Sequence, residues 1–331
     1  MLCDLNVPFP TEISSSSINQ LERVLITLIE LKYTHVAINK QLTPNMYQNQ
    51  SAGGQKNKNG NTNQSNKSEY DLKDDLNKFF ECFHKLVQKF GASLKLFARC
   101  TVEVNEPSKI GGVFIAMNGG IQNANGVTNK FDLISVLPLS EKGLIYLTSN
   151  SKGDVDILTF DYSNYFNGFH LKHKTMNSLA KKGIKIELVY SPLFCSSQQA
   201  IKFIANSKQV IRTCRNGTNS VLVSSGATSN LHVRNKLGVH TMLKFLGLKS
   251  HIYSRMMNEN PGLALLNGRL RLKSYQQVVT SGSDVVNGVS GIENEREVNG
   301  FAVRSSNKRT RDELETDKTA DGEDINHKKL K

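Results

Sequence analysis

Strand-length apolar runs recur along this 331-residue chain, and helix-length segments separate most of them. Most of the runs are apolar throughout, which is typical of strands buried on both faces of a sheet. An alternation of strands and helices predicts a parallel sheet whose crossover connections are the helices. The length and a hydrophobic content of 38% allow one sizeable core or two small ones, and they exclude a collagen-like, coiled-coil or wholly disordered chain.

Apolar runs predict eight strands, at Leu2–Phe9, Val36–Ile38, Leu94–Val104, Leu133–Leu139, Ile157–Phe160, Lys185–Tyr190, Val221–Ser224 and His251–Tyr253. Helices are expected at Ser14–Leu31, Asp71–Phe90, Lys172–Lys182, Gln198–Arg212, Lys236–Leu246 and Pro261–Leu270, with a short helical link after the fourth strand. Eight such units within about 270 residues predict a closed, TIM-barrel-like α/β fold. No dinucleotide-binding glycine motif follows the first strand, which weakens the alternative of an open doubly wound sheet.

Two polar insertions and a tail interrupt or follow this pattern. Residues 45–69 are almost entirely Asn, Gln, Gly, Ser and Lys, so burial cannot offset their ordering entropy and we expect a disordered low-complexity insertion. Residues 105–130 are rich in Gly and Asn, and the run 119–126 lacks the spacing of a phosphate-binding loop, so a loose insertion is expected there. One barrel domain is therefore predicted over residues 1–274, followed by a disordered tail over 275–331.

Several features bear on the compartment. The five cysteines have neither disulfide-framework nor zinc-finger spacing, which fits a reducing environment. No apolar run reaches the roughly 18 residues of a membrane span, and a secretory signal is not expected at the N-terminus. Two basic clusters, 308–311 and 328–331, have the pattern of a two-part nuclear import signal, with a solvated mixed-charge tail as the alternative.

Charge is distributed unevenly along the chain. Residues 168–273 contain 17 Lys and Arg against two acidic residues, whereas the preceding 167 residues are balanced. Such an excess within an apolar-rich segment implies a polyanionic partner. The chain has no Trp and few aromatic residues beside these cations, which favours phosphate contacts over base stacking. A structured RNA or a duplex is the expected ligand.

Candidate contact residues follow from the predicted elements of this segment. They are Lys208, Arg212 and Arg215 along one helix and its exit, Arg234 and Lys236 at the start of the next helix, and Arg255 after the eighth strand. Ser224 and Ser225, at the end of the seventh strand, offer hydroxyl and backbone N–H groups to a phosphate oxygen. A merely solvated charged face is the alternative, and the scarcity of acidic residues counts against it.

The predicted strand ends are also the places where a barrel enzyme holds its reacting groups. Asn6 and Pro8 stand where the histidine ligands of a metal-dependent hydrolase would be expected. The remaining candidate ligands are Asp4, Glu103, Asp161 and His251, which would serve a stand-alone metal-dependent phosphoesterase. The second half of the barrel contributes few carboxylates, so we expect no catalytic residue, metal or cofactor and keep the phosphoesterase as the alternative.

Several short motifs together resemble one known family. They are Asp4–Pro8 (DLNVP), Arg99–Val104 (RCTVEV), Ile186–Tyr190 (IELVY), Val221–Ala227 (VLVSSGA) with Arg234 downstream, and Lys244–Leu248 (KFLGL). Their order and spacing are similar to those of the barrel-like thirty-kilodalton protein subunit shared by nuclear ribonuclease P and ribonuclease MRP. The resemblance spans roughly residues 1–270, apart from the two polar insertions, whose contacts with neighbouring subunits it leaves open.

This resemblance implies a barrel related to the PHP-type metal phosphoesterases that has lost its metal ligands. It implies a non-catalytic, RNA-binding subunit of the ribonucleoprotein that removes 5′ leaders from precursor tRNA, with the endoribonuclease activity carried by the RNA of the complex. The MRP counterpart processes ribosomal RNA. The implied partners are ribonuclease P/MRP RNA, precursor tRNA and other protein subunits, including a small RRM-like one, and the implied location is the nucleus and nucleolus.

Within this hypothesis Arg99 joins the other cations as a predicted RNA contact. Two alternatives remain open at this point. One is the stand-alone phosphoesterase of the PHP type, and the other is a general nuclear RNA chaperone without a fixed complex.

Overall fold

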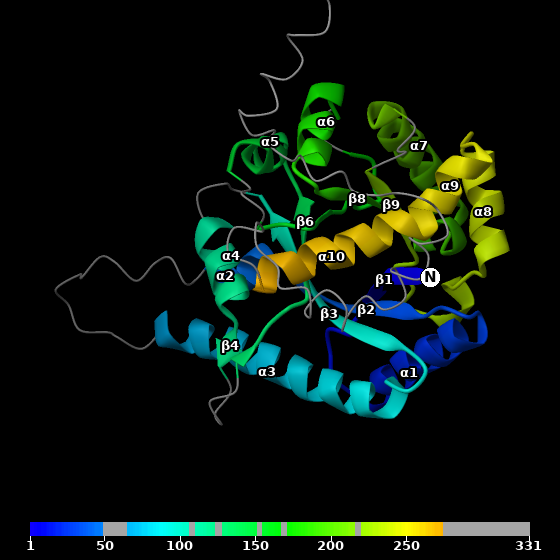
Figure 1. Ribbon diagram of the computed structural model, residues 1–331. Helices are drawn as coiled ribbons and strands as arrows, with labels where there is room; N and C mark the ends of the chain where they lie inside the picture. Colours follow the sequence, from blue (N-terminus) through cyan, green and yellow to red (C-terminus); the bar gives the residue numbers. More distant parts are fainter. Residues whose placement is uncertain are drawn as a thin grey trace, which may run out of the picture. The chain divides into compact units, whose positions relative to one another are not determined.

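The structure, a computed structural model, describes residues 1–48, 65–105, 110–122, 128–150, 154–166, 171–215 and 220–273. Seven parallel strands form its main sheet, in the order β1-β2-β3-β6-β7-β8-β9 (Figure 1). The strands are β1 (Cys3–Pro8), β2 (His35–Leu42), β3 (Lys95–Val104), β6 (Leu133–Pro138), β7 (Ile157–Leu158), β8 (Lys185–Val189) and β9 (Val221–Ser224). The two edges of the sheet meet where the Gly226 N–H donates a hydrogen bond of 2.9 Å to the Asn6 carbonyl. The predicted parallel α/β barrel is confirmed, nearly closed and with seven strands in the described residues instead of eight.

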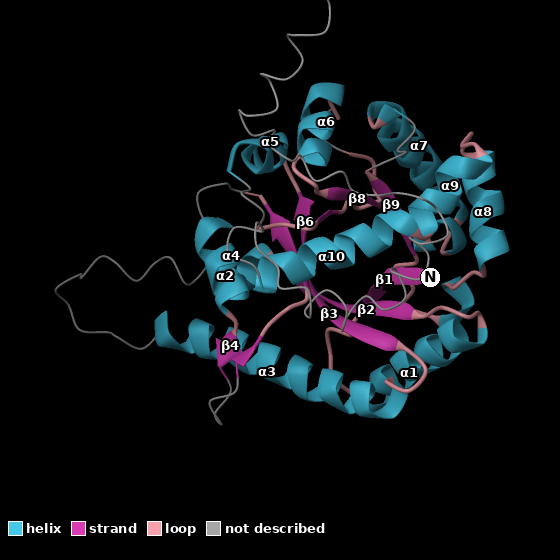
Figure 2. Ribbon diagram, in the orientation of Figure 1, coloured by secondary structure: helices cyan, strands magenta, loops and turns pink. Residues whose placement is uncertain are grey.

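Helices surround the strands (Figure 2). They are α1 (Ser15–Glu30), α2 (Pro44–Gln48), α3 (Ser65–Phe90), α4 (Ile110–Gly119), α5 (Glu141–Asn150), α6 (His173–Lys181), α7 (Ser197–Thr213), α8 (Lys236–Phe245), α9 (Ser250–Met257) and α10 (Glu259–Lys273). Two short 3₁₀ helices, η3 (Ser191–Phe194) and η5 (Asn230–His232), follow β8 and β9, and β4 (Ile121–Gln122) pairs with β5 (Thr128–Asn129) in a small antiparallel sheet. No helix among the described residues has the length and apolar character that a membrane crossing requires.

The first helix shows how the sequence pattern becomes structure. The Ser14 hydroxyl accepts the Ser17 N–H at 3.2 Å, and the Ser17 hydroxyl accepts the Ser14 N–H at 3.0 Å. This reciprocal cap satisfies two N–H groups that the start of a helix otherwise leaves unpaired. The apolar residues at helical spacing, among them Leu21, Leu25 and Leu28, are buried against the barrel. The predicted helix is thus confirmed almost to its ends.

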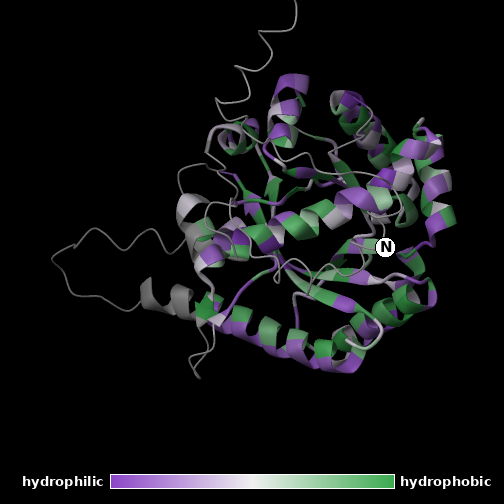
Figure 3. Ribbon diagram, in the orientation of Figure 1, coloured by the Kyte–Doolittle hydropathy of each residue, from purple (hydrophilic) through white to green (hydrophobic). Residues whose placement is uncertain are grey.

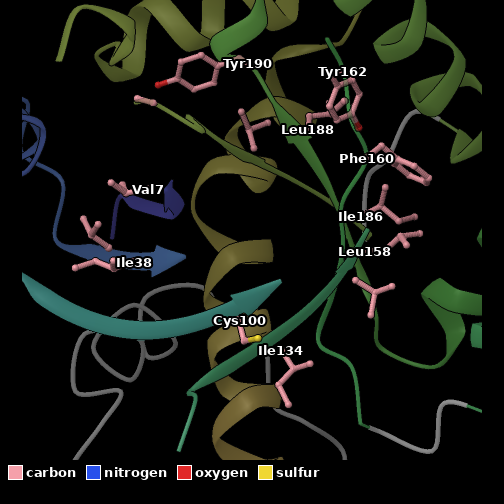
Figure 4. Packing of buried hydrophobic residues seen from close by; sticks show 14 of the residues in the cluster. Val7, Ile38, Cys100, Ile134, Leu158, Phe160, Tyr162, Ile186, Leu188 and Tyr190 are labelled. Carbon is pink, nitrogen blue, oxygen red and sulfur yellow. The ribbon is translucent and has the colours of Figure 1, made fainter. Parts of the chain in front are cut away.

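The main core lies between the strands and the surrounding helices. Alternate strand residues point outward into it, including Ile38, Cys100, Ile134, Leu158 and Ile186 (Figure 4). The colouring by hydropathy in Figure 3 shows the same pattern, because apolar residues line the strands and the helix faces turned toward them. The alternation follows from the two-residue period of a strand.

A second, smaller apolar cluster fills one end of the barrel. Cys3, Leu5, Ala37, Leu133, Ile157 and Leu222 point inward and pack with Ala264 of α10. Helix α10 crosses the N-terminal ends of the strands, where Asn260 Nδ2 donates to the Val221 carbonyl at 2.6 Å and Asn267 Nδ2 donates to the Gly183 carbonyl at 3.1 Å. The N-terminal end of the barrel is therefore covered by the last described helix.

The predicted eighth strand at His251–Tyr253 is wrong. These residues lie in α9, whose Ile252, Met256 and Met257 are buried. Three residues are too few to distinguish a strand period from a helix period, and the buried positions recur at helical spacing only when the segment is extended to Met257. Because this segment is helical, β9 closes directly toward β1.

The two insertions are more structured than predicted. Within 105–130, Val113, Phe114 and Met117 of α4 are buried, and β4 and β5 follow. The ends of 45–69 are helical, in α2 and the start of α3. Glycine and asparagine mask the apolar spacing of α4. Residues 49–64, the tail and its two basic clusters lie outside the described residues.

Candidate nucleic-acid interface

One buried ion pair occupies the interior of the barrel. Arg99 on β3 is fully buried, and its Nη1 and Nη2 lie 2.6 and 2.7 Å from the two carboxylate oxygens of Glu187 on β8. Its Nη1 also donates to the Leu5 carbonyl at 2.6 Å, and its Nε donates to the Ser135 hydroxyl at 2.9 Å. A bidentate arginine–carboxylate pair of this kind is strong and directional. Arg99 is therefore turned away from solvent, which does not agree with its predicted contact to RNA.

Neutral side chains extend this pair across the barrel. Asn6 Nδ2 donates to Glu187 at 3.2 Å, and Asn39 Nδ2 donates to Asn6 Oδ1 at 2.8 Å. The Thr101 hydroxyl donates to Asn39 Oδ1 at 2.7 Å and lies 2.5 Å from the Ser135 hydroxyl. These side chains thus pair their hydrogen-bonding groups with one another, and the two opposite charges of Arg99 and Glu187 cancel inside the barrel.

Asp4 lies beside this network but has other partners. Its Oδ1 accepts the Asn6 N–H at 3.2 Å and the Ser225 N–H at 3.0 Å. Burial raises the pKa of Asp4 to about 6, although the hydrogen bonds from Ser225 and Asn6 act in the opposite direction. The carboxylate therefore ties the end of β9 to β1.

The other candidate metal ligands lie apart from one another. Glu103 accepts a hydrogen bond of 2.6 Å from Gln41 Nε2, Asp161 is exposed and caps the following turn, and His251 is exposed on α9. The part of the chain that the structure describes contains no group of three or more His, Cys, Asp or Glu residues that could hold a metal ion. The structure does not bring the four predicted phosphoesterase ligands together.

Ser224 and Ser225 have a structural environment that differs from the predicted one. Both are buried, and Ser225 gives its N–H to Asp4 while its hydroxyl accepts the Ala227 N–H at 3.1 Å. The chain then turns at Gly226, with φ of 63°, where a Cβ would lie 2.2 Å from Val189 Cγ1. A side chain at this position would clash, so glycine is required. These residues close the barrel. A contact to a phosphate would require them to face solvent, and they do not.

The predicted cations of α7 are on the surface. Lys208 and Arg212 are exposed on α7 four residues apart, which places them on one face of the helix. Arg215 is exposed just beyond the end of the helix, where its φ is 48°. Helix α7 leads from the C-terminal end of β8 to the N-terminal end of β9, so this stripe lies toward the N-terminal ends of the strands. We call these three residues the α7 stripe.

Arg234 and Lys236 follow the C-terminal end of β9, and therefore lie toward the other end of the barrel from the α7 stripe. The Arg234 guanidinium lies 3.9 Å from the centroid of the Phe194 ring, and its Nη1 donates to the Leu231 and Val233 carbonyls at 2.5 and 2.9 Å. This contact fixes the direction of the cation. The sequence gives no signal for it, because Phe194 belongs to a different loop.

Backbone contacts hold Arg234 as well. Its N–H donates to the Tyr190 hydroxyl at 3.2 Å, and its carbonyl accepts the Tyr33 hydroxyl at 2.9 Å. Arg255 is different, because it lies on α9 and its Nε is 2.7 Å from Glu259. The predicted contact residues thus fall into a buried set, the α7 stripe, a pair after β9, and Arg255 on α9.

The exposed cations lie at different places on the barrel but share one stretch of the sequence without acidic residues. Residues 188–258, which include α7, α8 and α9, contain nine Lys and Arg and no Asp or Glu. We call this range the acid-free stretch. No acidic residue is a sequence neighbour of the α7 stripe, so its positive charge is not offset within this stretch.

Comparisons with known proteins place the chain among its relatives. The family described as RNase P subunit p30 matches residues 1–273. The chain is 36% identical over 309 residues to the ribonuclease P/MRP protein subunit RPP1 of Saccharomyces cerevisiae, covering 88% of this chain and 91% of that protein. It is 23% identical over 186 residues to the probable ribonuclease P protein subunit 3 of Schizosaccharomyces pombe, covering 56% of this chain and 72% of that protein.

A solved structure has the same fold. One chain in the cryo-EM structure of archaeal ribonuclease P with mature tRNA superposes with a TM-score of 0.53 at 12% identity, covering 85% of this chain and 97% of that chain. At that identity the likeness concerns the fold alone. From the family match over residues 1–273 and the identity to RPP1 over nearly the whole length, it follows that this chain belongs to the RNase P subunit p30 family of ribonuclease P/MRP protein subunits.

Proposed function

We propose that this protein is a non-catalytic, RNA-binding subunit of ribonuclease P/MRP that supports 5′-leader removal from precursor tRNA and processing of ribosomal RNA. The family membership supports its place in the complex. Its RNA partners are the RNA of the complex and precursor tRNA, and its protein partners are other subunits, including a small RRM-like one. It acts in the nucleus and nucleolus.

The α7 stripe is the observation that carries RNA binding. Its three cations are exposed and belong to the acid-free stretch, with Lys208 and Arg212 on one face of α7 and Arg215 just beyond the end of the helix. Cations in this arrangement bind the phosphates of a folded RNA and release its counterions, which makes the affinity depend on salt. Arg234 supports the proposal from the other end of the barrel, because stacking on Phe194 orders its side chain before any ligand arrives.

The barrel interior supports a non-catalytic role. Beneath the strand ends where a barrel enzyme presents its reacting groups, this chain has an internally paired arginine and glutamate with neutral amides and hydroxyls around them. These groups satisfy one another, so none is left with a free charge for acid–base chemistry. The described residues give the stand-alone phosphoesterase no observation in its favour.

Replacing Arg212 and Arg215 by Ala tests the α7 stripe. We expect weaker binding of a precursor-tRNA transcript by the full chain, because two phosphate contacts are lost. The slope of log K against log salt should fall by about 0.7–0.9 for each lost contact. The measurement is a binding titration at several salt concentrations.

The matched control replaces Arg23 on α1 and Lys78 on α3 by Ala, since both are exposed and lie outside the acid-free stretch. This variant removes the same net charge and should keep the slope of the unmodified chain. An equal fall in both variants would show a non-specific charge effect and would remove the α7 stripe from the interface.

A further inference from the structure

Large apolar side chains are unusually exposed in the acid-free stretch. Among the described residues, the four most exposed of these are Phe245 at 82%, Leu231 at 74%, Leu237 at 71% and Ile201 at 61%. All four lie between residues 188 and 258. Single exposed apolar residues are normal on a protein surface, but a local concentration of them marks an interaction site.

Helix α8 carries the clearest part of this concentration. One side of the helix packs on the barrel through Val239, Met242 and Leu243. The other side presents Leu237, Thr241 and Phe245, all exposed and each four residues from the next, so that they form one stripe. We call these three residues the α8 outer face.

Nothing in the described part of the fold covers this face. Figure 1 places α8 at the periphery of the barrel, where it packs on α9. Leu231, on η5 just before α8, adds a further exposed apolar side chain near the start of the helix. A helix with apolar residues on both sides is typical of one that is buried on both sides in its assembled state.

The surrounding charge identifies the kind of molecule that fits. Lys236 and Lys244 directly precede Leu237 and Phe245, Lys249 follows the helix, and all three lysines are exposed. No acidic residue occurs from 188 to 258. A second copy of this face would bring lysines against lysines, so charge opposes self-association through it. An acidic rim on the partner would complement it.

The apolar residues distinguish a protein partner from RNA. A phosphate backbone gains nothing from an exposed leucine. Phe245 could stack on a base, but Leu231 and Leu237, the next most exposed, are aliphatic and provide no stacking surface for RNA bases. A protein socket, by contrast, buries Leu and Phe at its centre and places charged groups at its rim. The α8 outer face has this pattern, with apolar residues along a helix and lysines beside them.

We propose that the α8 outer face is a docking surface for another protein subunit, one that offers an apolar socket bordered by Asp and Glu. This inference rests on the proposed function, because it takes the chain to work within a multi-subunit ribonucleoprotein. It assigns different tasks to adjacent helices. The α7 stripe contacts RNA, and the α8 outer face contacts protein, with Phe245 as the main anchor.

Site-specific photo-crosslinking in the ribonucleoprotein isolated through a tag on the full chain tests the contact. A photoreactive amino acid replaces Leu237 or Phe245, and in the control it replaces Ile145, which is 50% exposed on α5 outside the acid-free stretch. We expect a nuclease-resistant crosslink to a different protein from positions 237 and 245, within a peptide rich in acidic and apolar residues. A crosslink to RNA, a crosslink to a second copy of this chain, equal crosslinking at 145, or none at all would each overturn the proposal.

Paired substitutions separate apolar docking from RNA contact. Leu237→Lys with Phe245→Lys removes both apolar anchors and adds positive charge to a surface that is already positive. We expect at least a tenfold loss of the crosslinked subunit from the isolated particle, with affinity for a precursor-tRNA transcript unchanged or higher. Both side chains are largely exposed, and an unchanged thermal melt would verify that the fold is intact. Retention of the subunit by this variant would contradict the docking surface.

The Arg212→Ala, Arg215→Ala variant separates this inference from the proposed function. If docking alone fails, the full chain still binds the transcript with the salt slope that the α7 stripe predicts. If the chain neither binds the transcript nor isolates with a ribonuclease P or MRP RNA, the proposed function itself fails.

Discussion

Arg99 and Glu187 neutralise each other inside the barrel, in the middle of strands whose C-terminal ends would carry the reacting groups of an enzyme of this architecture. The pair is fully buried and draws Asn6, Asn39 and Ser135 into one hydrogen-bonded network. A buried ion pair adds little to the net free energy of unfolding. Removing one partner is costly, however, because the remaining charge is left in a low-dielectric interior. At the scale of single residues, this pair therefore has a structural role in the interior of the barrel.

Glu187→Gln should destabilise the protein by about 3–5 kcal/mol, because it leaves the Arg99 guanidinium buried without a counter-charge. The double variant Arg99→Met with Glu187→Leu should lose less stability than Glu187→Gln alone, since no charge remains to be buried. Urea unfolding of the wild type and the variants measures both differences. A double variant that is less stable than Glu187→Gln would contradict this account of the pair.

Asp4 gives the stability a distinct dependence on pH. Burial raises its pKa to about 6 in the folded state, above the ordinary value near 3.9 of an unfolded chain. The folded state then binds the proton more tightly, so the contribution of Asp4 to the free energy of unfolding falls as the pH rises from about 4 to 6 and stays low above that range.

Asp4→Asn removes this titration and keeps an acceptor for the Ser225 and Asn6 N–H groups. Relative to the wild type, the variant should gain stability progressively across that interval, by on the order of 1–3 kcal/mol at pH 7. Chemical unfolding at a series of pH values gives the difference between the two proteins. A difference that does not change between pH 4 and 7 would count against the raised pKa.

At the scale of elements, α10 covers the N-terminal end of the barrel and is held there by hydrogen bonds and an ion pair. Arg271 near its end binds the buried Asp156 at 3.0 Å and the Asn118 side-chain oxygen at 2.6 Å, which ties α10 to the loop before β7 and to α4. Gly268 makes the close approach possible, because a Cβ at that position would lie 2.3 Å from the Asp132 carbonyl oxygen. The cation at 271 therefore has a structural role, although it belongs to the basic half of the chain.

Gly268→Ala should destabilise the protein by about 1–3 kcal/mol, since α10 would have to move away from the backbone at Asp132. Gly111→Ala in α4 is the control, because the nearest atom to its added Cβ is the Tyr146 hydroxyl at 3.7 Å. Helix propensity predicts that this control is neutral or gains up to about 1 kcal/mol. Thermal and urea unfolding of the two variants, side by side, would reveal whether the close approach or the loss of glycine itself matters.

At the scale of the described barrel, the acid-free stretch forms one sector that α7, α8 and α9 cover. Like charges concentrated in one sector repel each other and reduce the stability of the compact state. A bound polyanion relieves that repulsion and stabilises the folded state by mass action. This distribution of charge supports the proposed role as an RNA-binding subunit, with the internally neutralised barrel as its frame.

The sequence predicted the elements well where the local pattern is long. The helix beginning at Ser14 and the strand Val221–Ser224 match the structure because caps and continuous apolar runs are local signals. The segment His251–Tyr253 was too short to reveal its period, and glycines concealed the apolar spacing of α4. The exposure of Lys208 and Arg212 also followed from helical spacing, and their contact with RNA stays a prediction.

The sequence by itself determined the parallel α/β architecture, the uneven charge and the family motifs, because each of these depends on neighbours along the chain. Only the tertiary structure decided that Arg99, 88 residues from Glu187 in sequence, is an interior residue, that Ser225 serves Asp4, and that α8 keeps an uncovered apolar side. These features depend on which strands and helices meet when the barrel closes. When two groups are this far apart in the sequence, the packing of the whole fold decides whether they meet. No local pattern of residues predicts such a contact.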